Sequence, residues 1–282
     1  MGTFARLLGR DLRHSAGDAA ASLGLPDLVP GTGGVVTEDE VAALPEVVRR
    51  YLRFMGVVGR PRDRSFTARF TGRFRLGPDK PWMRCEAWQY NAADPVARVF
   101  HMRLDVAGVV PMVGHDTYFR GHGRMHGTLL GLVTVAAGTG PEYDVSELVT
   151  YVNDCVLMAP SMLLGPSTQW AAAGEDAFDV TFTDSGLTVS ARLSVDAAGR
   201  PVGFSTEDRW AALPGGPVRA RWTTPVAGWD EIGGRPVPAG GAAVWHLPAG
   251  EYTYGEGRFS AVEWDVPPPR QAMPRATAWT MS

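Results

Sequence analysis

The stretch that decides the fold is FDVTFTDSGLTVSARLSV, residues 178–195. Apolar residues alternate with polar ones on both sides of Asp184-Ser185-Gly186, which has the composition of a turn. A period of two places the apolar side chains on one face of a strand, and a short turn containing Gly joins two strands into a hairpin. The stretch therefore predicts an antiparallel hairpin with one buried face.

The same alternation recurs along most of the chain. Between Phe66 and Leu76 the apolar residues face one way, while Thr and Arg face the other. Further strands are expected at 82–90, 98–106, 115–125, 128–135, 202–210, 218–224, 237–247 and 252–264. Nothing indicates a β-α-β alternation, so the sheet is predicted to be antiparallel. A sheet of this many strands rarely stays flat and open, so it is expected to curl.

Helical patterns occur near the start and in the middle of the chain. Thr37-Glu38-Asp39-Glu40 matches a capping box, and Pro45 fits the first residue of a second short helix. The clearest helix is expected at about 145–159, opened by Asp144-Val145-Ser146-Glu147 and stopped by Pro160. The predicted fold class is mainly β (α+β). A curled antiparallel sheet, half-barrel or lipocalin-like, packs around this central helix, with a short helical N-terminal region.

Three segments are expected along the chain. Residues 1–36 form a flexible or weakly helical N-terminal segment, whose apolar residues between positions 4 and 12 suggest a short amphipathic docking helix. Residues 37–264 form a single β-rich domain, and residues 265–282 form a Pro-rich C-terminal tail. The first 34 residues lack the apolar run of a secretory signal, and no segment approaches the roughly 20 apolar residues of a membrane span. The protein is therefore expected to be cytoplasmic, without integral membrane association.

Composition excludes some partners. The chain has 282 residues, 45% of them hydrophobic, and a formal net charge of −3, so it lacks the basic excess on which nucleic-acid binding depends. Its two cysteines, Cys85 and Cys155, are too few for a disulfide framework or a Cys-rich metal site. They are most simply two free, buried thiols in a reducing compartment, with a single bridge between them as the alternative. No cofactor is predicted.

Four histidines are possible metal ligands. His122 and His126 have a spacing that joins two ligands on a helix, but the glycines around them favour a strand, on which they would lie about 13 Å apart. His115 is expected to face the opposite way, and His101 lies on a neighbouring strand. Polar strand positions near turns are the favoured interpretation, so no metal site is predicted.

An ordered series of motifs runs from about Leu44 to Val266. It includes GHGRM (121–125), ELV (147–149), APS (159–161), RWTTP (221–225), GW (228–229) and AVWHLP (243–248). Together these motifs resemble a large bacterial family of uncharacterised, domain-of-unknown-function proteins that is common in actinobacteria. The resemblance implies no established activity. Where that family often has Glu and then Trp in its central helix, this chain has Asp154 and Leu157, which keeps an acid with a shorter reach and loses a Trp contact.

Polar residues of the central helix are the first candidates for chemistry. Glu147, Tyr151 and Asp154 lie on one face, at i, i+4 and i+7. This face is either solvated or, if the helix lies inside the curled sheet, directed into a cavity. In a cavity, Asp154 and Tyr151 could serve as general acid or base.

Further catalytic candidates lie on predicted strands. They are His101, His122 and Arg221. Arg209, Arg219 and Arg221 lie on adjacent predicted strands with Glu207 and Asp208, and Arg219 and Arg221 share a face. The group is either a surface ladder of weak ion pairs or an anion clamp, and the ladder is favoured.

Aromatic and Met side chains supply candidate pocket walls. Trp and Tyr suit such walls because each has an apolar body and one polar handle. The candidate ligand-binding residues are Trp88, Tyr118, Met125, Trp170, Trp222, Trp245, Tyr252 and Tyr254.

Three functions stay open at this point. The favoured one is binding of an apolar or amphipathic small molecule, lipid-like or a hydrophobic metabolite, in a cavity between sheet and helix. The second is a cofactor-independent enzyme, such as a cyclase, isomerase or hydrolase acting on a hydrophobic metabolite. The third is an interaction protein with a filled core. An apolar cavity favours binding, convergent ionisable groups at its base favour an enzyme, and a solid core with an exposed apolar patch favours interaction.

Overall fold

A computed structural model describes residues 21–27, 33–108, 110–130, 133–213 and 215–269. The expected docking helix near the N-terminus and most of the Pro-rich tail lie outside these ranges. The helices are α3 (Glu38–Ala42), α4 (Glu46–Phe54) and α5 (Pro141–Met158), and a 3₁₀ turn, η1, spans Pro160–Leu163. The strands are β1 (Ser65–Phe74), β2 (Met83–Ala93), β3 (Val96–Val106), β4 (Val110–Phe119), β5 (His122–Leu129), β6 (Val133–Thr139), β7 (Thr168–Ala172), β8 (Ala177–Asp184), β9 (Leu187–Val195), β10 (Pro201–Thr206), β11 (Trp210–Leu213), β12 (Gly216–Arg219), β13 (Arg221–Pro225), β14 (Trp229–Ile232), β15 (Arg235–Pro238), β16 (Gly241–Leu247) and β17 (Gly250–Trp264).

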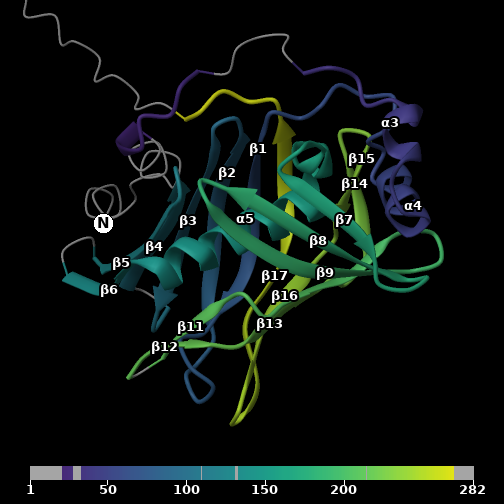
Figure 1. Ribbon diagram of the computed structural model, residues 1–282. Helices are drawn as coiled ribbons and strands as arrows, with labels where there is room; N and C mark the ends of the chain where they lie inside the picture. Colours follow the sequence, from purple (N-terminus) through teal and green to yellow (C-terminus); the bar gives the residue numbers. More distant parts are fainter. Residues whose placement is uncertain (1–20, 28–32, 109, 131–132, 214, 270–282) are drawn as a thin grey trace, which may run out of the picture.

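One large antiparallel sheet dominates the fold. In the described residues it contains 13 strands in the order β6-β5-β4-β3-β2-β1-β17-β16-β13-β10-β9-β8-β7. The first six strands form one meander, and β7, β8, β9, β10, β13 and β16 form a second, which the long β17 joins to the first by pairing with β1. Among the described residues, β11 with β12 and β14 with β15 form two separate two-stranded sheets. Figure 1 shows the sheet curling around α5. The predicted half-barrel around a central helix is therefore confirmed, as is the hairpin of residues 178–195, with Asp184 opposite Leu187.

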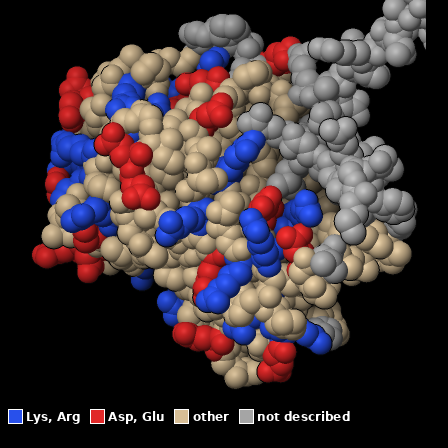
Figure 2. All heavy atoms as spheres, turned by 180° about the vertical axis from the view of Figure 1, so that it is seen from behind, with Lys and Arg blue, Asp and Glu red and all other residues tan. Residues whose placement is uncertain are grey.

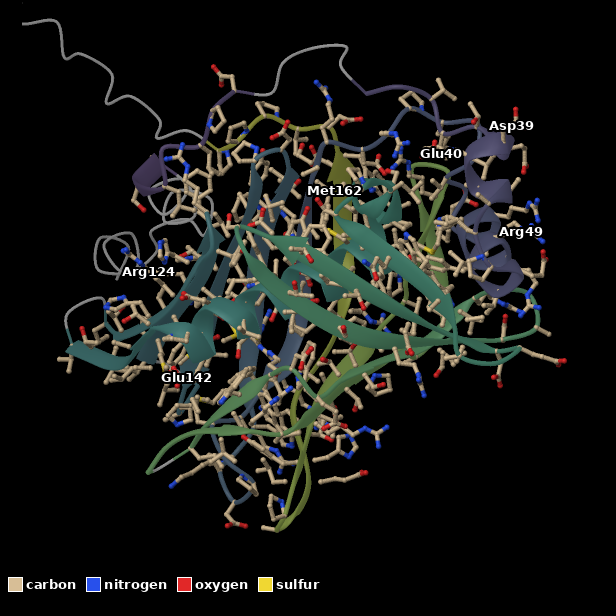
Figure 3. The ribbon with its side chains drawn as sticks, viewed as in Figure 1. Asp39, Glu40, Arg49, Arg124, Glu142 and Met162 are labelled. Carbon is tan, nitrogen blue, oxygen red and sulfur yellow. The ribbon has the colours of Figure 1, made fainter. Side chains whose placement is uncertain are left out.

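Helix α5 is covered on several sides. Every residue from Ser146 to Met158 is buried, so the helix lacks the exposed polar face of an ordinary surface helix. Several of its polar side chains are bonded to the strands around it. Trp210 donates its backbone N–H to the hydroxyl of Ser146 over 3.1 Å, and Thr224 donates to Asn153 Oδ1 over 2.6 Å. Figure 3 shows side chains filling the space between α5 and the strands.

The start of α5 differs from the expectation. The helix begins at Pro141, after Gly140 with φ of 108°, and not near residue 145. Proline at the first helical position is favourable because its missing N–H would have no partner there. Asp144 therefore lies inside the first turn, where its carboxylate accepts the backbone N–H of Gly123 over 2.7 Å. A Cβ at Gly123 would lie 2.2 Å from the carbonyl oxygen of Tyr143, so only glycine lets the helix pack this closely on β5.

The smaller helices follow the sequence prediction closely. The hydroxyl of Thr37 accepts the N–H of Glu40 at the start of α3, and Pro45 directly precedes α4. Tyr51 of α4 donates its hydroxyl to the carbonyl of Val156 in α5 over 2.7 Å, which ties this helix to the core. Among the described residues, no helix combines the length and apolarity that a membrane span requires.

Candidate functional site

A buried charged cluster joins α5 to the sheet. Arg98 of β3 donates from Nε to Asp154 and from Nη1 to Glu147, both over 2.8 Å. Glu147 and Asp154 lie two turns apart on α5, so their backbone positions are about 10 Å apart along its axis. Their side chains converge, so that one guanidinium bonds both carboxyl groups. Asn91 of β2 adds a longer contact of 3.4 Å from Nδ2 to Asp154. The exposed fractions of Arg98, Glu147 and Asp154 are only 3%, 4% and 6%.

Two partly buried charges lie beside this cluster. Asp116 is on β4, and Arg209 lies in the connection between β10 and β11. Burial raises the pKa of Glu147 to about 8, and the neighbouring charge of Asp116 adds to the rise against the opposing effect of Arg98 and Arg209. Burial also raises the pKa of Asp116, again against both arginines. Burial and the neighbouring carboxyl groups therefore favour the protonated forms of these two acids, although the two arginines act in the opposite direction.

Polar atoms next to the cluster have no hydrogen-bond partner among the described residues. They are Oδ1 of Asn91, Nε2 of Gln89 and Nε of Arg209. Asn91 is fully buried, and Gln89 is 5% exposed. Because an unpaired buried polar atom costs roughly 1–3 kcal/mol, these atoms mark a place where water or a polar ligand group would be stabilising.

The concave face of β2 to β5 changes from polar to apolar in successive cross-strand rows. The rows nearest α5 are Asn91-Arg98-Tyr118-Gly123 and Gln89-Phe100-Asp116-Met125. The next rows are Ala87-Met102-Gly114-Gly127 and Cys85-Leu104-Met112-Leu129. We call these four rows the concave wall. Phe100, Met102, Asp116 and Met125 are only partly buried, so the middle of the wall keeps contact with solvent.

An aromatic cluster stands beside the concave wall. The hydroxyl of Tyr254 accepts from Arg209 Nη1 over 2.9 Å and from Trp222 Nε1 over 3.0 Å. The guanidinium of Arg209 also lies over the rings of Trp222 and Trp245, 4.0 and 5.2 Å from their centroids. Tyr252 is next to Tyr254, with ring centroids 6.1 Å apart. Arg209 therefore links this cluster to the carboxylates under α5.

The predicted catalytic residues do not come together. Asp154 belongs to the charged cluster, whereas Tyr151 is fully buried with its ring against Phe182 of β8. His122 is exposed at the start of β5, and Arg221 is exposed at the start of β13.

The predicted arginine group also does not form a single ladder or clamp. Arg219 ends β12 and pairs with Asp208 over 2.5 Å, whereas Arg221 begins β13. The two arginines therefore lie on different strands and do not form one clamp.

The predicted ligand-binding residues fall into two groups. Trp222, Trp245, Tyr252 and Tyr254 form the aromatic cluster, and Met125 lies on the concave wall.

The second group lies elsewhere. Tyr118 is fully buried with its hydroxyl on Asp184 over 2.7 Å, and Trp170 packs on Tyr51 and Phe178 from the edge strand β7. Trp88 lies on the convex face, because it is opposite His101 in the ladder and His101 alternates with Arg98.

The histidines form a row that the sequence analysis did not predict. His115 is the direct cross-strand partner of both His101 and His126, with ring centroids 6.0 and 5.1 Å apart. The expectation that His115 lies on the opposite face of the sheet from His122 and His126 was wrong. Whether a residue number is odd or even gives its face only within one strand, and does not give the face of a residue on the next strand. Burial, with His126 nearby, lowers the pKa of His115. In the described ranges no group of three His, Cys, Asp or Glu has metal-binding geometry.

A small hollow and a larger one lie away from the concave wall in the described part of the chain. The smaller, of about 10 Å³, lies between the 55–63 segment, η1 and β15, and has room for one water at most. The larger, of about 280 Å³, is bordered by Trp88, Arg69, Glu263 and Val266. One basic residue, Arg69, and one acidic residue, Glu263, border this hollow. Basic and acidic side chains are also interspersed over the face of the molecule that Figure 2 shows.

Several cluster residues were missed by the sequence analysis. Arg98 shares the period of two with Phe100, Met102 and Leu104, so its place on the apolar face was readable from the sequence. Asp116 gave no comparable pattern, because its position depends on how the sheet curls. Arg209 was named as a member of the arginine group, but its place beside the carboxylates of α5 was not predicted. Both cysteines are buried and free, as the favoured interpretation held.

Comparison with known proteins identifies a family without a function. A search of curated proteins gave no match. Among solved structures, the chain is similar to a LolA superfamily protein of Nitrosomonas europaea, with 12% identity and a TM-score of 0.43 over 77% of this chain and 91% of that one. It is also similar to a DUF1329 family protein of Desulfovibrio piger, with 9% identity and a TM-score of 0.44 over 78% and 92% of the two chains. A family model matches residues 34–257, so the chain belongs to a family of unknown function, DUF6544.

Proposed function

We propose that the protein binds a small amphipathic molecule on the concave wall, with its polar end beneath α5 and its apolar end along the methionine rows. The observation that carries the proposal is the graded order of the four rows, from charged and amide side chains to Met, Leu and Cys. Four residues of one strand separate Asp116 from Met112, about 13 Å. This length suits a short alkyl or terpenoid-like molecule with one polar head.

Two glycines of the wall support an adaptable site. A Cβ at Gly114 would meet Met102 Cε only at 4.0 Å, and a Cβ at Gly127 would meet Met112 Cε at 3.4 Å. The two methionine side chains therefore lie over the glycines. Methionine is unbranched and flexible, so it yields space to a ligand more readily than other apolar side chains. Each ligand CH₂ that replaces water contact there contributes about 0.8 kcal/mol.

Binding fits this arrangement better than catalysis. Asp154, the acid that the sequence favoured, is held by Arg98 and Asn91 and is 6% exposed. A general acid or base must reach a substrate atom directly or through one water. The charged cluster meets that condition only at Asp116, so the enzyme alternative depends on a single carboxylate.

Native mass spectrometry tests the proposal. The protein is purified without detergent, its mass is measured under native conditions, and any released compound is identified after denaturing extraction. We expect a bound amphipathic molecule in the wild type and its loss in Gly114→Leu, which fills the wall above Met102. Gly203→Leu is the matched control, because Gly203 is a strand glycine on β10 with its nearest atoms at 3.8 Å. Equal occupancy in both variants, at equal melting temperatures, would place any ligand elsewhere.

A further inference from the structure

We infer that the apolar end of the concave wall docks on the surface of a lipid bilayer, and that the amphipathic molecule enters the wall there. This inference rests on the proposed function, because it names the partner that delivers the molecule to the wall. The docking surface consists of two hairpin tips, one between β3 and β4 and the other between β5 and β6. The backbone N–H of Leu130 donates to the carbonyl oxygen of Pro111 over 2.9 Å, so the two tips lie side by side. We call their described large apolar residues the rim; they are Val106, Val110, Leu129, Leu130, Val133 and Val135.

The rim continues the apolar rows of the concave wall. Leu129, at the end of the last row, is paired with Val133 of β6, the outer strand of the sheet (Figure 1). A Cβ at Gly127 would lie 3.4 Å from Met112 Cε and 3.7 Å from Val135 Cγ2, so Val135 borders the methionine. An apolar surface therefore runs from the rim to the methionine rows.

The rim is exposed and lies in uncharged sequence. The exposed fractions of Leu130, Val133 and Val135 are 45%, 59% and 48%. Exposed apolar residues that are scattered singly are ordinary, whereas contiguous ones mark a surface that contacts a partner. Neither 106–114 nor 127–141 contains Asp, Glu, Lys or Arg. The partner is therefore expected to cover apolar surface without supplying charge.

A bilayer fits the rim better than another protein does. Among its described residues, the rim lacks Trp, Tyr and Arg, the side chains that contribute most to protein interfaces. A β-bulge in β6, opposite Gly127 and Thr128, interrupts the regular spacing that a strand of a second copy would need for pairing. A contact as shallow as that of an interfacial helix, about 5–10 Å, also leaves the open backbone groups of β6 within reach of water in the headgroup region.

The order of the rows along the wall matches the order of polarity in a bilayer. An amphipathic molecule in a bilayer has its polar head toward water and its apolar end toward the hydrocarbon core. With the rim in the headgroup region, the methionine rows lie nearest the bilayer, and the rows of Asn91 and Asp116 lie furthest from it. The molecule can therefore pass from the bilayer to the wall without turning over.

Flotation with lipid vesicles tests the inference. The full chain is mixed with vesicles of phosphatidylcholine, and the bound fraction is measured against lipid concentration. We expect the wild type to bind, and its binding to change less than twofold when about a third of the lipid is replaced by phosphatidylglycerol. The reason is that Arg103 and Asp105, just before the first tip, pair with each other over 3.3 Å and add no net charge. Absence of binding to neutral vesicles, or binding only to anionic ones, would overturn the inference.

Two matched double variants locate the contact. Val133→Thr with Val135→Thr keeps β-branched side chains in β6 but exchanges two exposed methyl groups for hydroxyls. We expect this variant to bind phosphatidylcholine vesicles at least fivefold more weakly than the wild type. Val35→Thr with Val202→Thr is the control, because these valines are 53% and 47% exposed and lie outside the rim, and its binding should stay within twofold. Equal weakening by both pairs, or none by the first, would overturn the assignment to the rim. The wild-type comparison of the two lipids needs no variant, so it stands even if a variant folds poorly.

Two further measurements separate this inference from its alternatives. Sedimentation velocity without lipid measures self-association. A wild-type dimer that Val133→Thr with Val135→Thr loses, together with no vesicle binding, would assign the rim to a second copy and overturn the bilayer. Methyl NMR of the wall methionines with n-octanol reports binding by the wall itself. If n-octanol binds and vesicles do not, the inference fails and the proposed function stands. If vesicles bind and n-octanol does not, the proposed function fails, and with it the transfer to the wall, while docking on the bilayer stands.

Discussion

We expect removal of the Arg98 side chain to lower the stability of the folded protein strongly, and the variant Arg98→Met tests this. The substitution keeps an unbranched side chain but removes the guanidinium that bonds both Glu147 and Asp154 at 2.8 Å. Breaking a buried ion pair by removing one partner costs about 3–5 kcal/mol, because the other charge stays buried without compensation. Here the acidic side chains of both Glu147 and Asp154 lose their hydrogen-bond donor. Against a total stability of about 5–15 kcal/mol for a typical domain, the loss is large.

The assay is chemical unfolding with linear extrapolation to water at pH 7. We expect Arg98→Met to lose about 3–5 kcal/mol. The triple variant Arg98→Met, Glu147→Gln, Asp154→Asn should recover most of that loss, because neutral side chains remove the buried charge. A loss below about 1 kcal/mol, or a triple variant that is no better than the single one, would refute the view that this cluster fixes α5 in the sheet.

The remaining predictions concern pH, a hydrogen bond and a close contact. The folded pKa of Glu147, about 8, lies above its ordinary value of 4.5, so the folded protein keeps a proton that the unfolded chain releases; the free energy of unfolding should therefore fall as pH rises from about 4.5 to about 8. Urea unfolding of the wild type and of Glu147→Gln across this pH range measures the effect. The free energy of unfolding of Glu147→Gln should depend less on pH, and an equal fall in both proteins would show that Glu147 is not the group responsible. Tyr118→Phe removes a partly buried hydrogen bond of 2.7 Å to Asp184 and should lower the free energy of unfolding, measured by thermal unfolding, by about 1 kcal/mol. Gly123→Ala should cost several times more, because its methyl group would overlap the backbone of Tyr143; a melting temperature equal to that of the wild type would contradict the packing of α5 on β5.

Periodicity predicted the sheet well because strands with one buried face must alternate. The hairpin at 178–195, the face of β1 and the central helix all followed from local patterns. Helix ends were less certain. The Asp144 pattern looked like an N-cap, but Gly140-Pro141 starts the helix, and Asp144 bonds to Gly123 on β5. A tertiary contact decided which of two plausible start signals was used.

The candidate site needed information that no single segment carries. Arg98 could be placed on the inner face by its spacing, but its two partners come from a helix 49 and 56 residues later. The histidine row depends on register. Arg120 and Gly121 have φ of 51° and 79°, which form a tight turn that places His115 opposite His126. Counting along one strand could not give that pairing.

The central claim is that an amphipathic molecule binds the concave wall, and methyl NMR of methionine-labelled protein tests it most directly. Met102, Met112 and Met125 lie on the wall, whereas Met55, Met158 and Met162 are buried in the main core. During titration with n-octanol, the methyl signals of Met102 and Met112 should shift and saturate, while those of the three core residues stay still. Saturable shifts confined to the core methionines, or no shift of the Met102 and Met112 signals at saturating n-octanol, would contradict the account.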